Sequence, residues 1–267
     1  MENTINCNQE QTKFVAPKKV REKRKLYFRI LKKLMRSRYK APKFIYLGEE
    51  FGNGGIILSN HEGTDAPMSL EIHHDVPIRM WGASEMNSGL VSLYKYQTKV
   101  YYHEKKHWNI HLARLFCLIA SPLTNLFYSG LNLISTYHDT RFVKTIRESI
   151  DAIKSGDNIV IYPEISDNGY LPVLEGFHPG FVLLCEMCLK RGMDLPIYVT
   201  YFRHSDMVYI VDKPIYYSEV ASKLGTREEI AHYFCERCNA LGQMSFDGEG
   251  EGAEHTKGIE HTRTKIS

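Results

Sequence analysis

A histidine and an aspartate four positions apart, His61 and Asp65, have the residue types of a catalytic pair. A histidine side chain has an unperturbed pKa near ~6.5, so a large neutral fraction can accept a proton near neutral pH. A carboxylate beside it can hold one tautomer and stabilise the imidazolium that forms. The pair therefore predicts a general base and its partner. An aspartate that only caps a helix, beside a solvated or core histidine, fits the same spacing.

A second polar group, Glu164, follows the apolar run 159–162 much as His61 follows the apolar run 56–59. Ligands of open α/β sheets bind beyond the carboxyl ends of the strands, so we expect both side chains to face one cleft. The chain has no Gly-x-Ser-x-Gly motif, and no cysteine has an evident histidine partner, so no nucleophile for a covalent acyl-enzyme is visible. Direct transfer is expected instead. His61 would take a proton from a hydroxyl that attacks a thioester carbonyl, while N–H groups of the 63–66 turn could steady the oxyanion.

Strand-like apolar runs alternate with helical patterns along residues 44–243. This alternation predicts a single α/β domain with a mixed, mainly parallel sheet flanked by helices. Strands are expected at 43–47, 56–59, 76–81, 132–135, 159–162, 195–201 and 207–211. One helix is expected to start at Thr64 or Asp65, a second to follow the strand 132–135 and end at Ser155, and two more to span 179–190 and 227–241.

The stretch 83–128 is rich in aromatic residues and has no readable topology, so it could be a lipid-facing insertion. The run 112–134 is long and apolar enough to suggest a membrane span. It contains Arg114, Pro122, Asn125 and Asn132, however, which predict a buried or interfacial segment rather than a spanning one.

Positive charge is concentrated in residues 18–43, which contain thirteen Lys or Arg and one acid although the whole chain carries only +3. Apolar residues recur among these cations at helical spacing. The pattern predicts a basic amphipathic helix on a membrane surface, with contact residues Lys25, Tyr27, Leu31, Lys32 and Leu34. A solvated or packed helix also fits. Nucleic acid would attract the charge too, but phosphate binding alone does not require an apolar stripe.

Three sequence blocks resemble the glycerolipid and lysophospholipid acyltransferase family. They are Ser59-Asn60-His61 with the following Asp65, then Ile159-Val160-Ile161-Tyr162-Pro163-Glu164, then Leu195-Pro196-Ile197-Tyr198-Val199, and the match spans about residues 44 to 215. The resemblance implies an α/β enzyme on a membrane surface that moves an acyl chain from coenzyme A or acyl carrier protein to a glycerol-phosphate or lysolipid hydroxyl, with no other cofactor. It implies that His61 and Asp65 are the catalytic pair and that Glu164 is the acceptor-site carboxylate. The other residues expected to line the substrate site are Asn60, Gly63, Thr64, Pro163 and Ser166.

The chain departs from the family pattern at three places. His61 and Asp65 enclose three residues where the family usually has four. Residues 130–137 lack the arginine that contacts the acceptor phosphate, and Arg141 lies several residues later. After Glu164 stand Ile165, Ser166 and Asp167, where the family usually has Gly and then Arg. Because an arginine fork is the strong way to hold phosphate, we expect a hydroxyl acceptor other than glycerol 3-phosphate or lysophosphatidic acid.

Two Cys-x-x-Cys pairs, Cys185 with Cys188 and Cys235 with Cys238, could supply four thiolates to zinc. The pairs are separated by 46 residues and fall in predicted helices, so we interpret them as buried or surface thiols and expect no metal. Two further hypotheses stay open: a non-catalytic lipid-binding module of the same fold, and a zinc-dependent nucleic-acid-binding protein.

The first thirty residues are polar and then basic, without the apolar region of a secretory signal. We therefore expect a cytoplasmic protein, peripherally bound to the membrane, whose partners are membrane lipids and an acyl thioester donor but not nucleic acid. Residues 1–17 and 244–267 are polar and aperiodic, which predicts disordered ends around the helix 18–43 and the domain 44–243.

Overall fold

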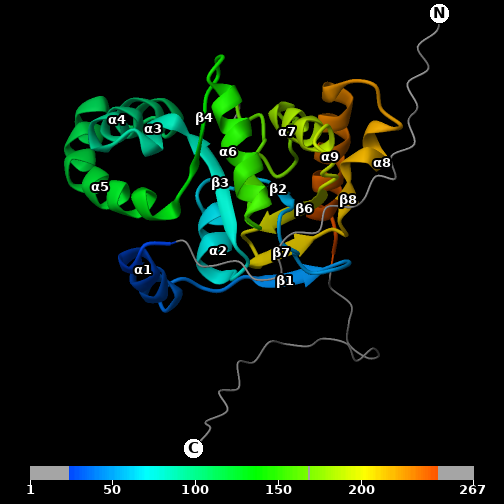
Figure 1. The fold of residues 1–267 in the computed structure, drawn as a ribbon. Helices are drawn as coiled ribbons and strands as arrows, with labels where there is room; N and C mark the ends of the chain where they lie inside the picture. The colour runs from blue at the N-terminus through cyan, green and yellow to red at the C-terminus, as the bar shows by residue number, and fades with distance from the viewer. Residues whose placement is uncertain (1–23, 168, 246–267) are drawn as a thin grey trace, which may run out of the picture.

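The computed structural model of the chain describes residues 24–167 and 169–245 (Figure 1). The segment 1–17 and most of the segment 244–267, which were predicted to be disordered, lie outside these residues. A central sheet crosses the described part, and helices lie on both of its faces.

The described strands form one eight-stranded sheet in the order β1-β7-β6-β2-β5-β3-β4, with β8 paired to β6. Only the pairs that β6 makes with β7 and β8 are antiparallel. The strands are β1 (Lys43–Tyr46), β2 (Ile56–Ser59), β3 (Ile78–Ala83), β4 (Ile134–Thr136), β5 (Asn158–Ile161), β6 (Pro196–Arg203), β7 (Val208–Val211) and β8 (Ile215–Tyr216). The predicted α/β domain with a mixed, mainly parallel sheet is confirmed.

The central strands contribute alternate residues to two apolar cores, one on each face of the sheet. On β2, Ile56 and Leu58 belong to one core and Ile57 to the other. Successive side chains of a strand point to opposite faces, so a strand that is covered on both sides must be apolar at nearly every position. All four residues of β2 are buried, and so are all four of β5. The residues that follow these two strands are therefore held by the rigid centre of the domain.

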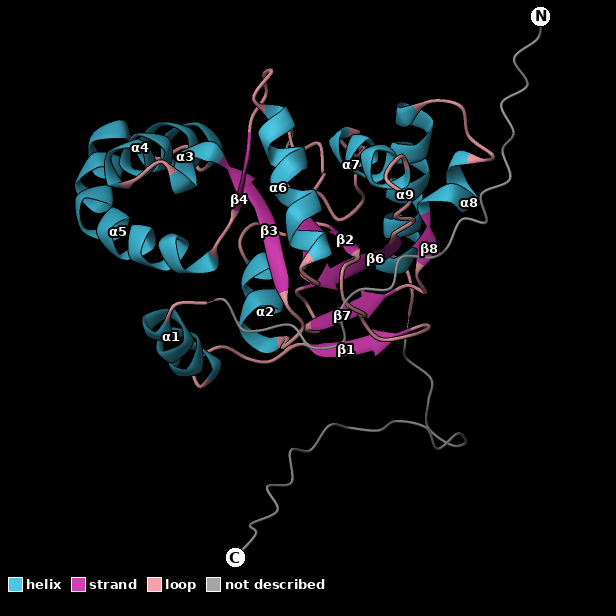
Figure 2. Ribbon diagram, viewed as in Figure 1, coloured by secondary structure: helices cyan, strands magenta, loops and turns pink. Residues whose placement is uncertain are grey.

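Helices cover the two faces of the sheet unequally (Figure 2). The core that contains Ile56 is completed by α6 (Phe142–Lys154), α7 (Gly180–Leu189), α8 (Tyr217–Ala221) and α9 (Arg227–Gly242). The core that contains Ile57 is completed by α2 (Asp65–His73) and α1 (Leu26–Arg36). The start of α9 is fixed by a capping box, in which Thr226 and Glu229 each accept the other's backbone N–H.

Residues 84–131 form a helical lobe beside β3 and β4, in the stretch whose topology the sequence does not reveal (Figure 1). The helical lobe consists of α3 (Ser84–Asn87), α4 (Leu90–Tyr96), the π-helix η1 (Gln97–Lys105) and α5 (Ile110–Leu131). By length and composition alone, α5 could cross a membrane. Of the two environments predicted for this segment, a buried one does not apply, because only 17% of its most apolar window is buried.

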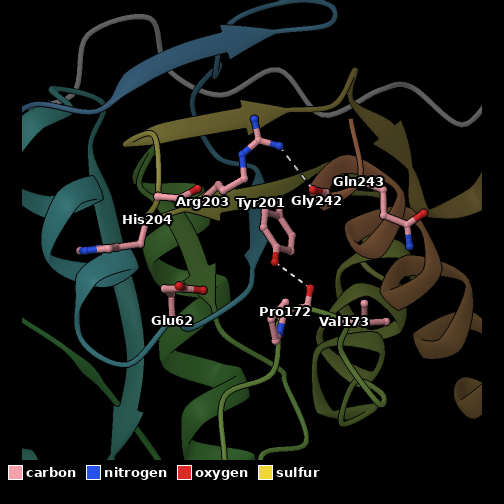
Figure 3. Close-up of a pocket in the computed structure, with 9 residues that line it drawn as sticks. Glu62, Pro172, Val173, Tyr201, Arg203, His204, Gly242 and Gln243 are labelled. Carbon is pink, nitrogen blue, oxygen red and sulfur yellow. Dashed lines mark hydrogen bonds between the residues drawn. The ribbon is translucent and has the colours of Figure 1, made fainter. Parts of the chain in front are cut away.

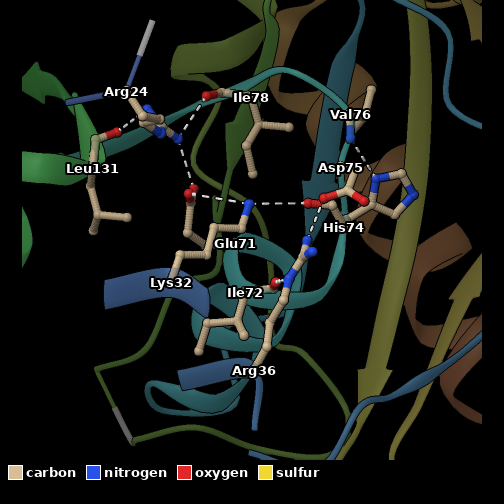
Figure 4. A network of polar contacts seen from close by, with 10 residues as sticks. All are labelled: Arg24, Lys32, Arg36, Glu71, Ile72, His74, Asp75, Val76, Ile78 and Leu131. Atoms are coloured by element: carbon tan, nitrogen blue, oxygen red, sulfur yellow. Dashed lines mark hydrogen bonds and ion pairs between the residues drawn. The ribbon is translucent and has the colours of Figure 1, made fainter. Parts of the chain in front are cut away.

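Ion pairs attach α1 and the residue Arg24 before it to α2 and the residues that follow it (Figure 4). The carboxylate of Glu71 accepts a hydrogen bond from Arg24 at 2.7 Å, and Nζ of Lys32 lies 3.8 Å from the same carboxylate. One turn further along α1, Arg36 pairs with Asp75. These contacts, together with the buried ring of Phe28, make α1 part of the folded domain.

Candidate functional site

His61 follows the buried strand β2, and Asn60 fixes the direction in which the chain leaves that strand. Nδ2 of Asn60 donates to the carbonyl of Phe202 at 2.9 Å, and Oδ1 accepts from the N–H of Phe202 at 2.7 Å. The amide of Asn60 thereby extends the β2–β6 pairing by one residue. Asn60 was expected to bind substrate. At 1% exposure, with its amide bound to the backbone of Phe202, it holds the chain that leads into His61.

The backbone turns sharply after His61. Glu62 has φ of 43° and Gly63 has φ of 69°, in the left-handed region that residues other than glycine seldom adopt. The N–H of His61 donates to Oε2 of Glu164 at 2.9 Å. Because β2 and β5 are parallel neighbours, the residues after them emerge at one edge of the sheet, and the structure brings His61 and Glu164 into contact there.

Glu164 is held in a short paired segment and is 8% exposed. Its neighbour Ile165 donates to the carbonyl of Gly176 at 2.9 Å, and the N–H of His178 donates to the carbonyl of Pro163 at 2.7 Å. Residues 163–165 therefore pair with 176–178, and the chain between them returns past His61. Glu164 thus supports the backbone of His61 from a fixed position.

Two tyrosine rings surround the imidazole of His61. The Tyr170 ring stacks on it with centroids 5.0 Å apart and an interplanar angle of 15°, and the Tyr162 ring meets it edge-on at 5.1 Å. Burial, aided by the nearby Tyr96, Glu164 and Tyr101, raises the pKa of Tyr170 to about 12. Because Tyr96 and Tyr101 belong to α4 and η1, the helical lobe approaches the site on this side.

Asp65, the predicted partner of His61, contacts a different histidine. Its Oδ2 lies 3.1 Å from Nδ1 of His204, and both side chains are more than half exposed. The contact arises because α2 starts beyond the end of β2, while His204 follows the neighbouring strand β6. The rings of Tyr162 and Tyr170 pack against the imidazole of His61.

A pocket of about 360 Å³ lies where β6 ends, and Glu62, the residue after His61, is one of the residues that line it (Figure 3). It is lined in part by Glu62, Arg203, His204 and Tyr201, whose hydroxyl donates to the carbonyl of Pro172 at 2.7 Å. Burial raises the pKa of the Glu62 carboxyl, and the nearby His204 opposes that shift. The pocket is large enough for a small ligand or for part of a larger one.

Arg141, the arginine that follows the expected phosphate position in sequence, and Arg203, which lines the pocket, are both paired with carboxylates. Arg141 pairs with Asp139 on the surface at 2.7 Å, and the guanidinium of Arg203 binds Asp206 at 2.7 Å and the carbonyl of Met244 at 2.7 Å. Hydrogen bonds from Arg141 lower the pKa of Asp139 to about 2. Both guanidinium groups therefore already hold a carboxylate.

The remaining predicted site residues lie around the same turn and loop. Gly63 and Thr64 lead into α2, and Thr64 occupies the N-cap position without forming a side-chain cap bond. Pro163 is buried, and Ser166 is half-buried with its carbonyl accepting from the N–H of Gly169 at 3.1 Å.

Sequence reasoning missed Tyr170, Glu62, Arg203 and His204. The sequence could have indicated His204 as a site residue, because it follows the predicted strand 195–201 and so emerges at a strand end. Nothing in the sequence indicated Tyr170, since its loop is placed beside His61 only by the pairing of residues 163–165 with 176–178.

The predicted membrane contacts on α1 divide between two faces. Tyr27 donates to the carbonyl of Leu126 at 3.3 Å and lies 2.7 Å from the hydroxyl of Ser129, Leu31 is half-buried in the core, and Lys32 binds Glu71. These three side chains face the protein. Lys25 and Leu34 are exposed, so only these two of the five remain candidates for membrane contact.

The four cysteines of the Cys-x-x-Cys pairs are core residues of α7 and α9. Burial raises the pKa of each thiol, which opposes the thiolate form that zinc requires. Cys238 lies 3.3 Å from the carbonyl of Thr200, to which its thiol can donate. Within residues 24–167 and 169–245, no three His, Cys, Asp or Glu side chains are grouped so that they could hold a metal ion.

Comparison with protein-family models found none that matches the chain, and comparison with curated proteins likewise found no match. A function for this chain is therefore argued from its own residues and geometry.

Proposed function

We propose that the protein is an acyltransferase that moves a fatty acyl group from a thioester donor to a hydroxyl of a lipid or lysolipid at a membrane surface, with His61 as general base. The observation that carries this proposal is the hydrogen bond between the His61 backbone and Glu164. It joins two of the three sequence blocks that resemble the acyltransferase family at one edge of the sheet, where Glu62, the residue after His61, lines a pocket.

The chemistry follows from the position of the imidazole. His61 removes the proton of the acceptor hydroxyl while the hydroxyl oxygen bonds to the thioester carbonyl carbon. The tetrahedral intermediate then collapses, the carbon–sulfur bond breaks, and the leaving thiolate takes the proton from the imidazolium. N–H groups of the 63–66 turn would stabilise the oxyanion, as helix N-termini do for anions.

The aromatic rings around His61 suit this role. The face of Tyr170 stacks on the imidazole, and an aromatic face attracts a cation, so it favours the imidazolium that forms during the reaction. Asp65 remains close enough to influence the site through His204 and Glu62. The engaged arginines support an acceptor without a phosphate next to the reacting hydroxyl.

The test uses labelled acyl-coenzyme A and acyl carrier protein with a panel of lysolipids and monoacylglycerols. We expect transfer by the wild-type protein and a loss of roughly 100- to 10,000-fold in His61→Ala, which is the usual contribution of a positioned base. His138→Ala, which removes an exposed histidine distant in sequence from both blocks, should act like the wild type. Phosphate-free acceptors should be preferred to lysophosphatidic acid.

Two results would count against the proposal. Transfer that is unaffected in His61→Ala would exclude this histidine as the base. Lipid binding without transfer of any acyl group, equal in wild type and His61→Ala, would instead support a non-catalytic lipid-binding module.

A further inference from the structure

The helix α5 is apolar on the side that faces away from the protein. Six large aliphatic side chains project outward and are between 50% and 74% exposed: Leu112, Leu115, Leu118, Ile119, Leu123 and Leu126. We call them the α5 face. The inward stripe is small or polar instead, with Ala113, Cys117 and Ser121 buried. This distribution is the reverse of a surface helix in water, which buries its large apolar side chains.

The inward stripe binds the rest of the helical lobe. The hydroxyl of Ser121 donates to Oε1 of Gln97 in η1 at 2.7 Å, and the Tyr102 ring meets Phe116 at 5.2 Å. The helix is therefore covered along one side. Exposed charges such as Lys95, Lys99 and Glu104 lie on the covering elements. If α5 crossed the bilayer, these charged side chains would enter the hydrocarbon, and the transfer of each from water would cost several kcal/mol. A position of α5 parallel to the membrane surface avoids this cost.

The charge near the α5 face fits an anionic surface. The 22 residues of α5 and the 11 residues of α1 include no Asp or Glu. Arg114 is exposed on α5, and Arg29 and Lys33 are exposed on α1. Basic residues close to an anionic bilayer each contribute about 1 kcal/mol to binding.

The helix α1 lies against the last turns of α5. A Cβ at Gly130 would collide with the Phe28 ring, so the two helices touch where α5 has no side chain, and Tyr27 contacts Ser129. The outward side of α1 carries a second apolar stripe, Leu26, Ile30 and Leu34, at four-residue spacing. Aliphatic stripes and cations thus continue from one helix to the next.

We propose that the α5 face lies in the interfacial layer of an anionic phospholipid bilayer, with α1 beside it. This inference rests on the membrane association in the proposed function and names the surface responsible for it. It also places a lipid surface next to the elements that carry Tyr96 and Tyr101, which approach Tyr170 at the candidate site.

The test is co-sedimentation of the full chain with vesicles of phosphatidylcholine and phosphatidylglycerol. Ile119→Glu should lower the partition coefficient by about tenfold or more, because a buried aliphatic side chain is lost and a charge is added. Val143→Glu is the matched control: this side chain is 62% exposed on α6, and the same charge there should leave binding unchanged. Brominated lipid should quench the fluorescence that Ile119→Trp adds to that of the native Trp81 and Trp108, but not the fluorescence that Val143→Trp adds.

Three outcomes would overturn the inference: no binding of the wild type to these vesicles, equal binding of wild type and Ile119→Glu, or a lipid-free dimer that Ile119→Glu dissociates without any effect on vesicle binding. The last would identify the α5 face as a protein interface. Two variants separate a failure of this membrane inference from a failure of the catalytic proposal. His61→Ala should sediment like the wild type, and Ile119→Glu should keep transfer to water-soluble short-chain acceptors.

Discussion

At the scale of single residues, the aspartate of the predicted catalytic pair contacts another histidine. His61 is oriented by its backbone bond to Glu164 and by two tyrosine rings, while Asp65 reaches across to His204. The three-residue spacing between His61 and Asp65 places the aspartate in the first turn of α2. The residue types were informative, but spacing alone did not determine which histidine the carboxylate contacts.

The contact between Asp65 and His204 makes a prediction about activity. Asp65→Asn and His204→Ala should each lower acyl transfer by less than about tenfold, far less than His61→Ala, because an exposed pair contributes less than about 1 kcal/mol. The double variant should be no slower than either single variant, since all three remove one contact. Steady-state rates of the four proteins test this. A loss in Asp65→Asn as large as that in His61→Ala would show that the carboxylate serves His61 directly.

At the scale of elements, α1 and α5 each have two different faces. The sequence of α1 predicts an amphipathic helix, yet Tyr27 and Leu31 face the domain while Leu26, Ile30 and Leu34 face outward. Both stripes are apolar, so periodicity could not decide which of them packs on the protein. The ion pairs of Glu71 with Arg24 and Lys32 determine which stripe packs on the protein, because they hold that side of α1 against α2.

Removal of Glu71 should therefore loosen α1. Its side chain is 2% exposed between Arg24 and Lys32, so Glu71→Ala leaves two partly buried cations without this carboxylate and should cost about 3 kcal/mol or more of unfolding free energy. Asp75→Ala breaks the other α1–α2 ion pair, whose carboxylate is 72% exposed, and should cost less than about 1 kcal/mol. Urea unfolding compares the two. Equal losses of unfolding free energy in the two variants would mean that the burial of Glu71 does not strengthen its contribution to stability.

At the scale of the whole molecule, the parallel central strands bring the site together and the two cores hold it rigid. Residues 103 positions apart, His61 and Glu164, meet because β2 and β5 are neighbours. The helical lobe then lies between this edge and the outward α5 face. One molecule thereby presents both a candidate site and a candidate membrane surface.

The stability of the whole fold should depend on pH through His74, which is half-buried between α2 and β1. Its Nδ1 accepts from the N–H of Val76 at 3.0 Å and its Nε2 lies 2.9 Å from the hydroxyl of Tyr46, and burial lowers its pKa to about 4. Between about pH 6.5 and 4 the unfolded chain binds a proton that the folded protein does not, so stability falls as the pH falls. From pH 7 to 5 this loss should be about 1 to 2 kcal/mol.

The variant His74→Asn should weaken that pH dependence, because its Oδ1 can still accept from Val76 but does not titrate. His204→Asn, at an exposed position, should retain the wild-type dependence. Denaturant unfolding at pH 7 and pH 5 measures both. If the unfolding free energy of His74→Asn falls between pH 7 and pH 5 as much as that of the wild type, other groups cause the pH dependence.

The sequence by itself determined the α/β class, most strands, and the two strand ends that carry His61 and Glu164. These follow from local patterns: runs such as 56–59 are apolar at every position because both sides of the strand are covered. The helical lobe was not predictable, because α5 turns its large apolar side chains outward and so reverses the usual rule.

Only the tertiary structure decided which side chains meet. Asn60 binds Phe202, Asp65 contacts His204 and Tyr170 stacks on His61 through pairings between distant segments. Local sequence fixes the period of a strand or helix, whereas strand order and loop return fix its neighbours. The histidine and aspartate were visible in the sequence, but their partners depend on contacts that no local spacing encodes.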